Sequence, residues 1–266
     1  MNADPTDVKV AITNVTRTFP ARHGELVALQ DVSLSIADGE FVAIVGPSGC
    51  GKSTLLRMVA GLATPTGGTV EVVRRDSERE PSAMVFQEHA LFPWLTVGDN
   101  VSFGPRNRGV SKENCRAIAE EQLSRLGLAQ FAGYYPHQLS GGMKQRVGIA
   151  RAMAQDAEIL LMDEPLGALD AQTRTLLQDQ ILQLRQESRP TAMYVTHAID
   201  EAIFLADRVI LMSARPGRVT EEITVPFPSE RGPEVRGTAE FARLTQEIWD
   251  HLHHEVETAM AEEARR

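Results

Sequence analysis

The stretch FVAIVGPSGCGKSTLLRMVAGL, residues 41–62, constrains the fold of this chain more than any other. A short apolar run leads into a glycine-rich loop, and the loop leads into a helix-like run. The loop matches the pattern G-x-x-x-x-G-K-[ST], in which glycines let backbone N–H groups turn toward phosphate oxygens. With average residue usage, a chain of this length matches by chance on the order of once in a hundred. The stretch therefore predicts a strand–loop–helix unit that binds nucleotide phosphates.

Two side chains of this loop have predicted roles of their own. Lys52 is placed to reach the β- and γ-phosphates, and the Ser53 hydroxyl to ligate Mg²⁺. The following helix adds the positive end of its dipole. The residues predicted to contact the nucleotide here are Gly46, Pro47, Ser48, Gly49, Cys50, Gly51, Lys52, Ser53 and Thr54.

Short apolar runs of strand type recur along the chain, and helical stretches at 52–60 and 171–186 separate some of them. Several runs are apolar throughout, which is typical of strands buried on both faces of a parallel sheet. The chain is therefore predicted to have α/β organisation. The expected strands are VAIT near the start, FVAIV before Gly46, AMVF before Gln87, ILLM before Asp163, AMYV before Thr196, and RVILM at 208–212.

Polar residues follow these runs at the point where ligands bind in open parallel sheets. In EILLMDEP, Asp163 is predicted to hold Mg²⁺, and Glu164 to act as general base on the attacking water. Gln87 and His197 are predicted to face the γ-phosphate and the water. Taken alone, the two carboxylates would be a solvated strand end and the histidine a structural residue. With the phosphate loop present, the functional interpretation is favoured, and five residues are expected to converge on one crevice: Gly46, Gln87, Asp163, Glu164 and His197.

Composition bounds the class of protein. The chain has 266 residues and a formal net charge of −9, which argues against a general nucleic-acid-binding surface. Two cysteines cannot build a disulfide scaffold, so a reducing compartment is expected. We see no secretory signal and no apolar stretch near the roughly 20 residues of a spanning helix. Any membrane role is therefore expected to come through a partner.

The pattern of apolar residues changes between residues 91 and 155, where strand-like runs become scarce. One helix is predicted after Ser111 as N-cap, and a second after Ser140. Before this segment, Val70 to Ala83 suggests a weak β-hairpin. The predicted division is an α/β core at 1–90 and 156–228 with an antiparallel β subdomain, a helical lobe at 91–155, and a helical tail at 229–266.

The sequence QLSGGMKQR, residues 138–146, opens the second lobe helix and follows no strand. Ser140 is a good N-cap, and the helix dipole there favours an anion. Gly141 and Gly142 expose N–H groups but are costly at a helix start unless something approaches closely. From the residues alone, a second phosphate site and an ordinary capped helix are equally supported.

At this point the chain resembles the ATP-binding subunits of ABC transporters. The resemblance covers roughly residues 8–225 and uses GPSGCGKST, Gln87, LSGGM, ILLMDE, the GALD loop at 167–170, and His197, in that order. It implies a P-loop NTPase core of RecA type that hydrolyses ATP with Mg²⁺, held by Ser53, Gln87 and Asp163. The residues implied in catalysis are Glu164, His197, Gln87 and Lys52.

The resemblance also implies a head-to-tail homodimer. In such a dimer Ser140, Gly141 and Gly142 bind the γ-phosphate of ATP held by the partner, and Asp170 links the two sites. Phe19 looks like the aromatic residue that stacks on adenine. Met143 stands where the broad family usually has Gln, which leaves that side chain without an assigned role.

Three stretches look like the nitrate, sulfonate and taurine importer group: VFQEHALFPWLTVGDNV, YPHQLSGGMKQRVGIARA, and the tail around EIWDHLHHE. This implies permease subunits as partners, indirectly an extracytoplasmic solute-binding protein, and a peripheral position on the cytoplasmic side of the inner membrane. Residues 87–100 would include the surface that receives a permease helix. Trp94 is expected either to contact that helix or to be a buried core aromatic.

Other classes of protein remain as alternatives. The main one is a soluble ABC-type ATPase of DNA repair or translation, which would need a long coiled coil or two cassettes in one chain. A GTPase or kinase would not explain LSGGM, and a non-catalytic subunit would not explain intact Lys52, Asp163, Glu164 and His197. The transported solute stays open, as does the role of the tail. In the tail, an apolar helical stripe is expected from Phe241, Leu244, Ile248, Trp249, Leu252 and Val256.

Overall fold

The structure, a computed structural model, describes residues 7–21, 24–167 and 169–263. The chain divides into two compact units. The first unit comprises Met1–Arg74 and Arg185–Arg266, and the second comprises Arg75–Leu184. The three-part division expected from the sequence stays a prediction.

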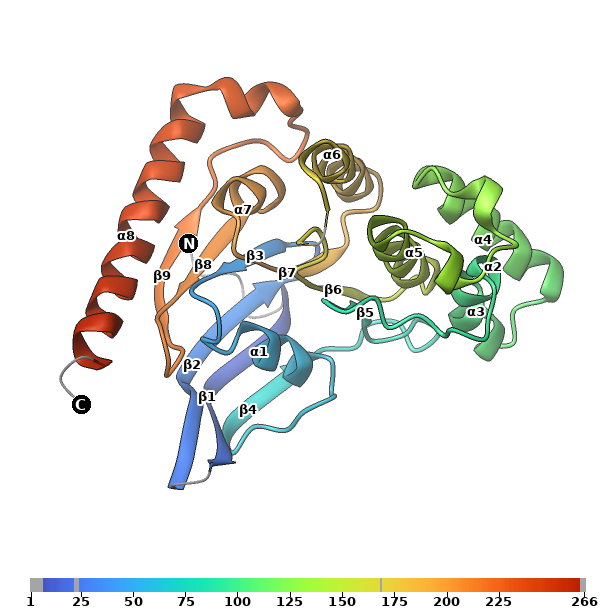
Figure 1. Cartoon of the computed structure of the whole chain (residues 1–266). Helices are drawn as coiled ribbons and strands as arrows, with labels where there is room; N and C mark the ends of the chain where they lie inside the picture. The colour runs from blue at the N-terminus through green and yellow to red at the C-terminus, as the bar shows by residue number, and fades with distance from the viewer. Residues whose placement is uncertain (1–6, 22–23, 168, 264–266) are drawn as a thin grey trace. The chain divides into compact units, whose positions relative to one another are not determined.

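The first unit contains an antiparallel sheet in the order β2-β1-β4 (Figure 1). Its strands are β1 (Val8–Ala21), β2 (Gly24–Ala37) and β4 (Gly67–Val72). The central strand β1 pairs with both neighbours, so that Ile12 lies opposite Leu34 on one side and Val70 on the other. Alternating burial along β2 matches a sheet with one covered face. The expected antiparallel subdomain is therefore present.

The expected hairpin from Val70 to Ala83 is wrong. β4 pairs with β1, whereas Ala83 begins β5 (Ala83–Val85), which pairs with another strand in the second unit. The segment between them, VRRDSEREPS, is rich in charge and lacks the apolar alternation of a strand. Instead, the Glu158 carboxylate accepts hydrogen bonds from the Arg75 and Asp76 amides at 3.0 and 3.1 Å.

Four further strands of the first unit lie in the order β7-β3-β8-β9. They are β3 (Phe41–Val45), β7 (Thr191–Thr196), β8 (Arg208–Met212) and β9 (Val219–Thr224). β3 runs parallel to β7 and β8, and every residue of β3 and β7 is buried, as their unbroken apolar runs predict. β9 was not predicted; it is antiparallel to β8 and mostly exposed.

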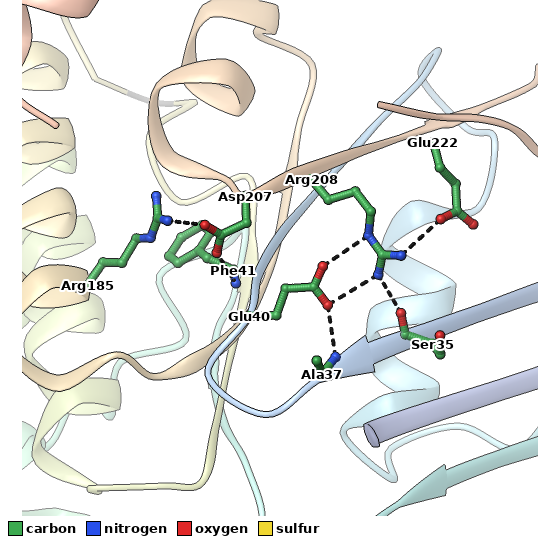
Figure 2. Close-up of polar contacts among 8 residues, drawn as sticks. All are labelled: Ser35, Ala37, Glu40, Phe41, Arg185, Asp207, Arg208 and Glu222. Carbon is green, nitrogen blue, oxygen red and sulfur yellow. Dashed lines mark hydrogen bonds and ion pairs between the residues drawn. The ribbon is translucent and has the colours of Figure 1, made fainter. Parts of the chain in front are cut away.

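Figure 2 shows the polar network at the amino ends of β3 and β8. Arg208 forms ion pairs with Glu40 and Glu222, each at 3.0 Å, and donates to the Ser35 carbonyl. Arg185 pairs with Asp207, whose other carboxylate oxygen accepts from the Phe41 amide at 3.0 Å. These contacts tie together the amino ends of β3 and β8. The phosphate loop follows the opposite, carboxyl end of β3.

Two helices of the first unit follow strands of this sheet: α1 (Lys52–Val59) and α7 (Ile199–Leu205). The tail begins with a 3₁₀ turn, Pro233–Gly237, and continues as α8 (Ala239–Glu263), which packs beside α7 (Figure 1). No helix in the described part of the chain is both long and apolar enough to cross a membrane.

The apolar stripe of the tail is confirmed for its first half. Phe241, Leu244 and Ile248 are buried, and Leu252 is half-buried. Trp249 departs from the expectation, since it is 57% exposed and stacks on His253 instead. The side chain of Val256 lies outside the described residues.

The second unit combines β5 and β6 (Ile159–Asp163), which run parallel, with a group of helices. The helices are α2 (Val97–Val101), α3 (Phe103–Asn107), α4 (Lys112–Arg125), α5 (Gly141–Ala154) and α6 (Ala171–Ser188), with 3₁₀ turns at Ala129–Phe131 and Pro136–Gln138. Ser111 caps α4 by accepting from the Asn114 amide at 3.2 Å, as predicted. α6 ends four residues inside the first unit.

Candidate functional site

The phosphate loop connects β3 to α1 in the first unit. Gly51 is the N-cap of α1 with φ of +103°, a left-handed conformation that favours glycine. Lys52, the first residue of the helix, is 5% exposed. Its Nζ donates to the carbonyls of Gly46 and Pro47 at 2.7 and 2.9 Å. The lysine is thus folded over its own loop, with its charge among the groups predicted to hold phosphates.

Close packing explains why glycines stand in and behind this loop. A Cβ on Gly51 would lie 2.6 Å from Cδ2 of Leu29, and a Cβ on Gly46 would lie 2.8 Å from the Met212 carbonyl oxygen. Cys50 is buried, and burial raises the pKa of its thiol above the ordinary value. The thiol therefore stays protonated at neutral pH, which suits a packing role.

The turn after β8 packs against the phosphate loop. The sequence did not predict this contact. Arg215 donates to the Gly49 carbonyl from Nη2 at 3.0 Å and from Nε at 3.2 Å. A Cβ on Gly217 would lie only 1.9 Å from the Cys50 carbonyl oxygen. The stretch SARPGR could have signalled this role, because it follows a predicted strand at the edge where the loop also lies.

His197 directly follows β7 in the same unit and is exposed. The strand register places Val45, the last residue of β3, opposite Thr196. The phosphate loop and His197 therefore leave the sheet at the carboxyl ends of two adjacent strands. Their predicted convergence on one crevice stays a prediction.

Phe19, the predicted adenine contact, lies near the end of β1 and is half-buried. The guanidinium carbon of Arg17 lies 4.6 Å from the centre of its ring. Arg17 is held in turn by a 2.7 Å hydrogen bond from Nη1 to the Thr64 carbonyl.

The predicted Mg²⁺ ligand Asp163 and the predicted general base Glu164 lie at the end of β6 in the second unit. Asp163 is the last residue of the strand and is 1% exposed. Glu164 has φ of +46°, which is uncommon for a residue with a side chain. The Gln87 amide donates to its carboxylate at 3.3 Å. The structure thus brings together two residues that lie 77 positions apart in the sequence.

The signature stretch opens α5, also in the second unit. Ser140 caps this helix by accepting from the Met143 amide at 3.3 Å, and the Gly141 carbonyl lies 2.9 Å from Nε2 of His89. A Cβ on Gly142 would come within 3.0 Å of Cδ2 of Leu169. A Cβ on Gly141, in contrast, would meet no atom within 4 Å. Packing in this chain therefore explains the second glycine and not the first.

Asp170 has a defined local role at the start of α6. Its carboxylate accepts from the Thr173 amide at 2.9 Å and from the Thr173 hydroxyl at 2.8 Å. These hydrogen bonds hold the pKa of Asp170 below its usual value. The charged form therefore caps the helix at neutral pH. Ala168, in the same loop, lies outside the described residues.

The predicted site residues divide between the units. The phosphate loop, Phe19 and His197 belong to the first unit, whereas Gln87, Asp163, Glu164, Ser140 and Asp170 belong to the second. Their convergence on one nucleotide stays a prediction.

Comparison with known families decides the identity. The sequence model described as ABC transporter matches residues 29–167. An ATP-binding protein of Brucella abortus is 47% identical over 249 residues, which cover 93% of this chain and 94% of that protein. The chain belongs to the ABC transporter family. It is an ATP-hydrolysing, ATP-binding subunit of that family.

Two further relatives of this ABC subunit carry names with a transported solute. A taurine import ATP-binding protein of Jannaschia is 43% identical, covering 91% of this chain and 94% of that one. A nitrate import ATP-binding protein of Synechocystis is also 43% identical, covering 89% and 92%. These relatives support an ABC importer ATPase and not the soluble ATPase that the sequence left as an alternative.

A solved dimeric structure of a bacterial ABC transporter cassette has the same fold. It matches with a TM-score of 0.75 and 36% identity over 82% of this chain and all of that one. A second structure of the dimeric cassette, in a post-hydrolysis state with ADP and phosphate, matches equally well. The predicted fold class of the ABC subunit is confirmed.

Trp94 is 71% exposed in the ABC subunit, so the alternative of a buried core aromatic is wrong. Its loop is fixed by Asn100, a fully buried residue that sequence reasoning missed. The Asn100 side chain accepts from the Phe92 amide at 2.8 Å and donates to the carbonyls of Phe92, Leu95 and Thr96. A lone Asn at a helix end gives no signal of such a role in the sequence.

Proposed function

We propose that this ABC ATPase energises the uptake of a small anion or sulfonate-like solute, such as nitrate, an aliphatic sulfonate or taurine. The support is the pair of importer relatives with those solutes in their names, each 43% identical to this chain. In this proposal the solute passes through the permease and never touches the ATPase. No residue described above therefore selects it.

The observation that carries the proposed chemistry is the contact between Gln87 and Glu164 at 3.3 Å, with Glu164 held at φ of +46°. Glu164 accepts the proton of the attacking water as general base, and the Gln87 amide orients the carboxylate and the water. Lys52 and His197 stabilise the charge on the γ-phosphate. The base follows a buried strand, so its backbone is held firmly.

Mg²⁺ is proposed to be held by Ser53, Gln87 and Asp163. Their hydroxyl, amide and carboxylate oxygens are the hard donors that this ion prefers, and Asp163 presents its carboxylate from a buried strand end. When bound, the ion neutralises charge on the β- and γ-phosphates. The protein groups keep their own tasks of binding, orientation and proton transfer.

The proposed dimer is head to tail, with Ser140, Gly141 and Gly142 closing on the ATP of the partner subunit. The open space around Gly141 supports this, because glycine at a helix start is costly and no described atom outside its own helix backbone and chain neighbours lies within 4 Å of the position a Cβ would take. A partner's phosphate is a ligand that would need such close approach. Asp170 would then have a second role beside its helix cap.

The proposed permease contact is the surface around Trp94. Phe92 lies 5.6 Å from Trp94 and 4.5 Å from Phe103, measured between ring centres. Beside it, α2 and α4 line a cavity of about 440 Å³. The lining of the cavity combines apolar side chains such as Ala119 and Leu123 with charged ones such as Arg116 and Glu120. An amphipathic permease helix suits such a surface.

The position in the cell follows from these partners. The subunit is peripheral to the membrane, bound through the permease, and we place it on the cytoplasmic side of the inner membrane. An extracytoplasmic solute-binding protein would deliver the solute to the permease. No nucleic acid is among the proposed partners.

The test of the proposed chemistry is Glu164→Gln. Losing a general base should lower ATP hydrolysis by about 100-fold to 10,000-fold, while ATP binding persists. An ATP-bound dimer should accumulate, measured by size-exclusion chromatography with bound nucleotide. Glu88→Gln makes the same substitution at an exposed residue next to Gln87 and should leave turnover intact. Retained turnover in the Glu164 variant would remove it as the base.

A further inference from the structure

A buried carboxylate in α7 lies close to the turn that carries His197. Glu201 is 3% exposed, and its Oε2 accepts two hydrogen bonds. The Tyr194 hydroxyl donates at 2.8 Å and the Thr196 hydroxyl at 2.9 Å. Both donors are buried residues of β7. A buried carboxylate is costly without such partners, so the three side chains form a fixed unit.

The same unit holds the backbone on both sides of His197. Thr196 lies just before it, and its hydroxyl donates a hydrogen bond to Glu201. The same hydroxyl oxygen accepts a hydrogen bond from the Ala198 amide at 3.0 Å. Ala198, just after it, receives the first backbone hydrogen bond of α7, from the Ala202 amide at 3.2 Å. Only the histidine between them is exposed. Its place therefore depends on the link from Glu201 through Thr196 to Ala198.

We propose that Glu201 is the positioning residue for His197 and acts through the Thr196 hydroxyl. This inference rests on the proposed role of His197 at the γ-phosphate. Glu201 would touch neither ATP nor water. Its task is to keep the 196–198 turn in one conformation, so that the imidazole meets the phosphate at the right distance. A shift of about 1 Å in such a group lowers rates by as much as 100-fold.

The first test compares substitutions along one strand. Thr196→Val removes the hydroxyl from the link, and Glu201→Gln replaces the carboxyl group that accepts from it with an amide. Each should lower kcat about 10-fold to 100-fold while KM for ATP changes by less than about 2-fold. Thr196→Ser keeps the hydroxyl and should restore most of kcat. Tyr194→Phe removes only the outer donor and should lower kcat less.

The matched control is Thr191→Val at the other end of β7. Thr191 is equally buried, and its hydroxyl donates to Asp38 at 3.1 Å and accepts from the Gly39 amide. Its substitution should leave kcat unchanged. If Thr191→Val lowers kcat as much as Thr196→Val does, the effect is general destabilisation and the inference is overturned.

The second test is a double-mutant cycle with His197→Ala. If Glu201 acts through His197, then Glu201→Gln and Thr196→Val should cause no further loss of kcat in the His197→Ala background. A full additional loss there would overturn the inference. If His197→Ala alone keeps kcat, the proposed role of His197 fails. If it abolishes kcat while Thr196→Val and Glu201→Gln keep theirs, only the positioning role fails.

Discussion

At the scale of single residues, the turn after β8 fixes the conformation of the phosphate loop. The Gly217 backbone leaves no room for a methyl group beside the Cys50 carbonyl, while Arg215 donates twice to the Gly49 carbonyl. The loop therefore depends on a turn more than 160 residues away in the sequence. That turn is not among the segments predicted to contact phosphates, so we expect its effect on ATP to act through the loop.

Gly217→Ala should weaken ATP binding. A Cβ 1.9 Å from the Cys50 carbonyl forces the loop to move. Overpacking of this kind costs about 1–3 kcal/mol, which corresponds to a loss of about 5-fold to 150-fold in affinity if the loop takes up the strain. Titration with a fluorescent ATP analogue measures it. Gly237→Ala is the control, since a Cβ there meets nothing within 4 Å. Equal affinities of the two variants would refute the prediction.

Glu40 makes the stability depend on pH. Burial raises the pKa of its carboxyl above 4.5, although the Ala37 amide and Arg208 favour the charged form. An acid whose folded pKa is raised stabilises the fold most below its unfolded pKa, and this contribution is lost as pH rises through the folded pKa.

The stability of the wild type relative to Glu40→Gln should therefore increase when pH is lowered from about 8 to about 5. Urea denaturation at each pH measures the difference. Glu222→Gln, which removes the other partner of Arg208, serves as the comparison. A difference between wild type and Glu40→Gln that is constant with pH would contradict the assigned burial effect.

At the scale of elements, neighbouring residues of the tail helix α8 differ in burial. Ile248 is fully buried, whereas Trp249 is 57% exposed. Ile248→Ala should destabilise the protein by about 2–5 kcal/mol, because it removes buried contacts and leaves a cavity. Trp249→Ala should change the free energy of unfolding by less than about 0.5 kcal/mol. Chemical denaturation measures both, and equal losses would show that the helix packs differently.

Strands with unbroken apolar runs were predictable, since FVAIV, ILLM and AMYV are buried on both faces and flanked by the residues of the candidate site. β9 was not, because its VTEEIT sequence is mostly exposed and carries little apolar signal. The Val70–Ala83 hairpin failed since the true partner of β4 is β1, which lies far away in the sequence. Asn100 and Glu201 gave no signal in the sequence, because their hydrogen bonds to nearby residues form only in the folded loop and turn. Arg215 was missed although SARPGR follows a predicted strand, because its contact with Gly49 joins residues 166 positions apart.

At the scale of the whole molecule, the proposal divides each ATP site between two chains. Mixed dimers can separate this from a site within one chain. In a dimer of Lys52→Ala and Ser140→Ala subunits, both carrying Glu164→Gln, the trans arrangement leaves one site intact and one doubly impaired. One ATP should then be trapped per dimer, because Glu164→Gln prevents its hydrolysis.

In the second dimer, one subunit carries both Lys52→Ala and Ser140→Ala, and the other carries neither. Both subunits again carry Glu164→Gln. Every trans site then has one defect, and trapping should be lost. Counting nucleotide in dimers purified through two affinity tags measures both cases. Trapping in this second dimer and none in the first would exclude the shared site.

The chain has two tryptophans, Trp94 and Trp249, and both stand in solvent, one in each compact unit. Exposed indoles emit at long wavelength and respond when another surface covers them. Replacing either one with Phe gives a protein with a single tryptophan, whose emission can be excited apart from that of the three tyrosines. Emission from Trp94 alone would then report the approach of a permease helix, and emission from Trp249 alone would report any cover over the tail. The molecule thus carries an optical probe for each surface without chemical labelling.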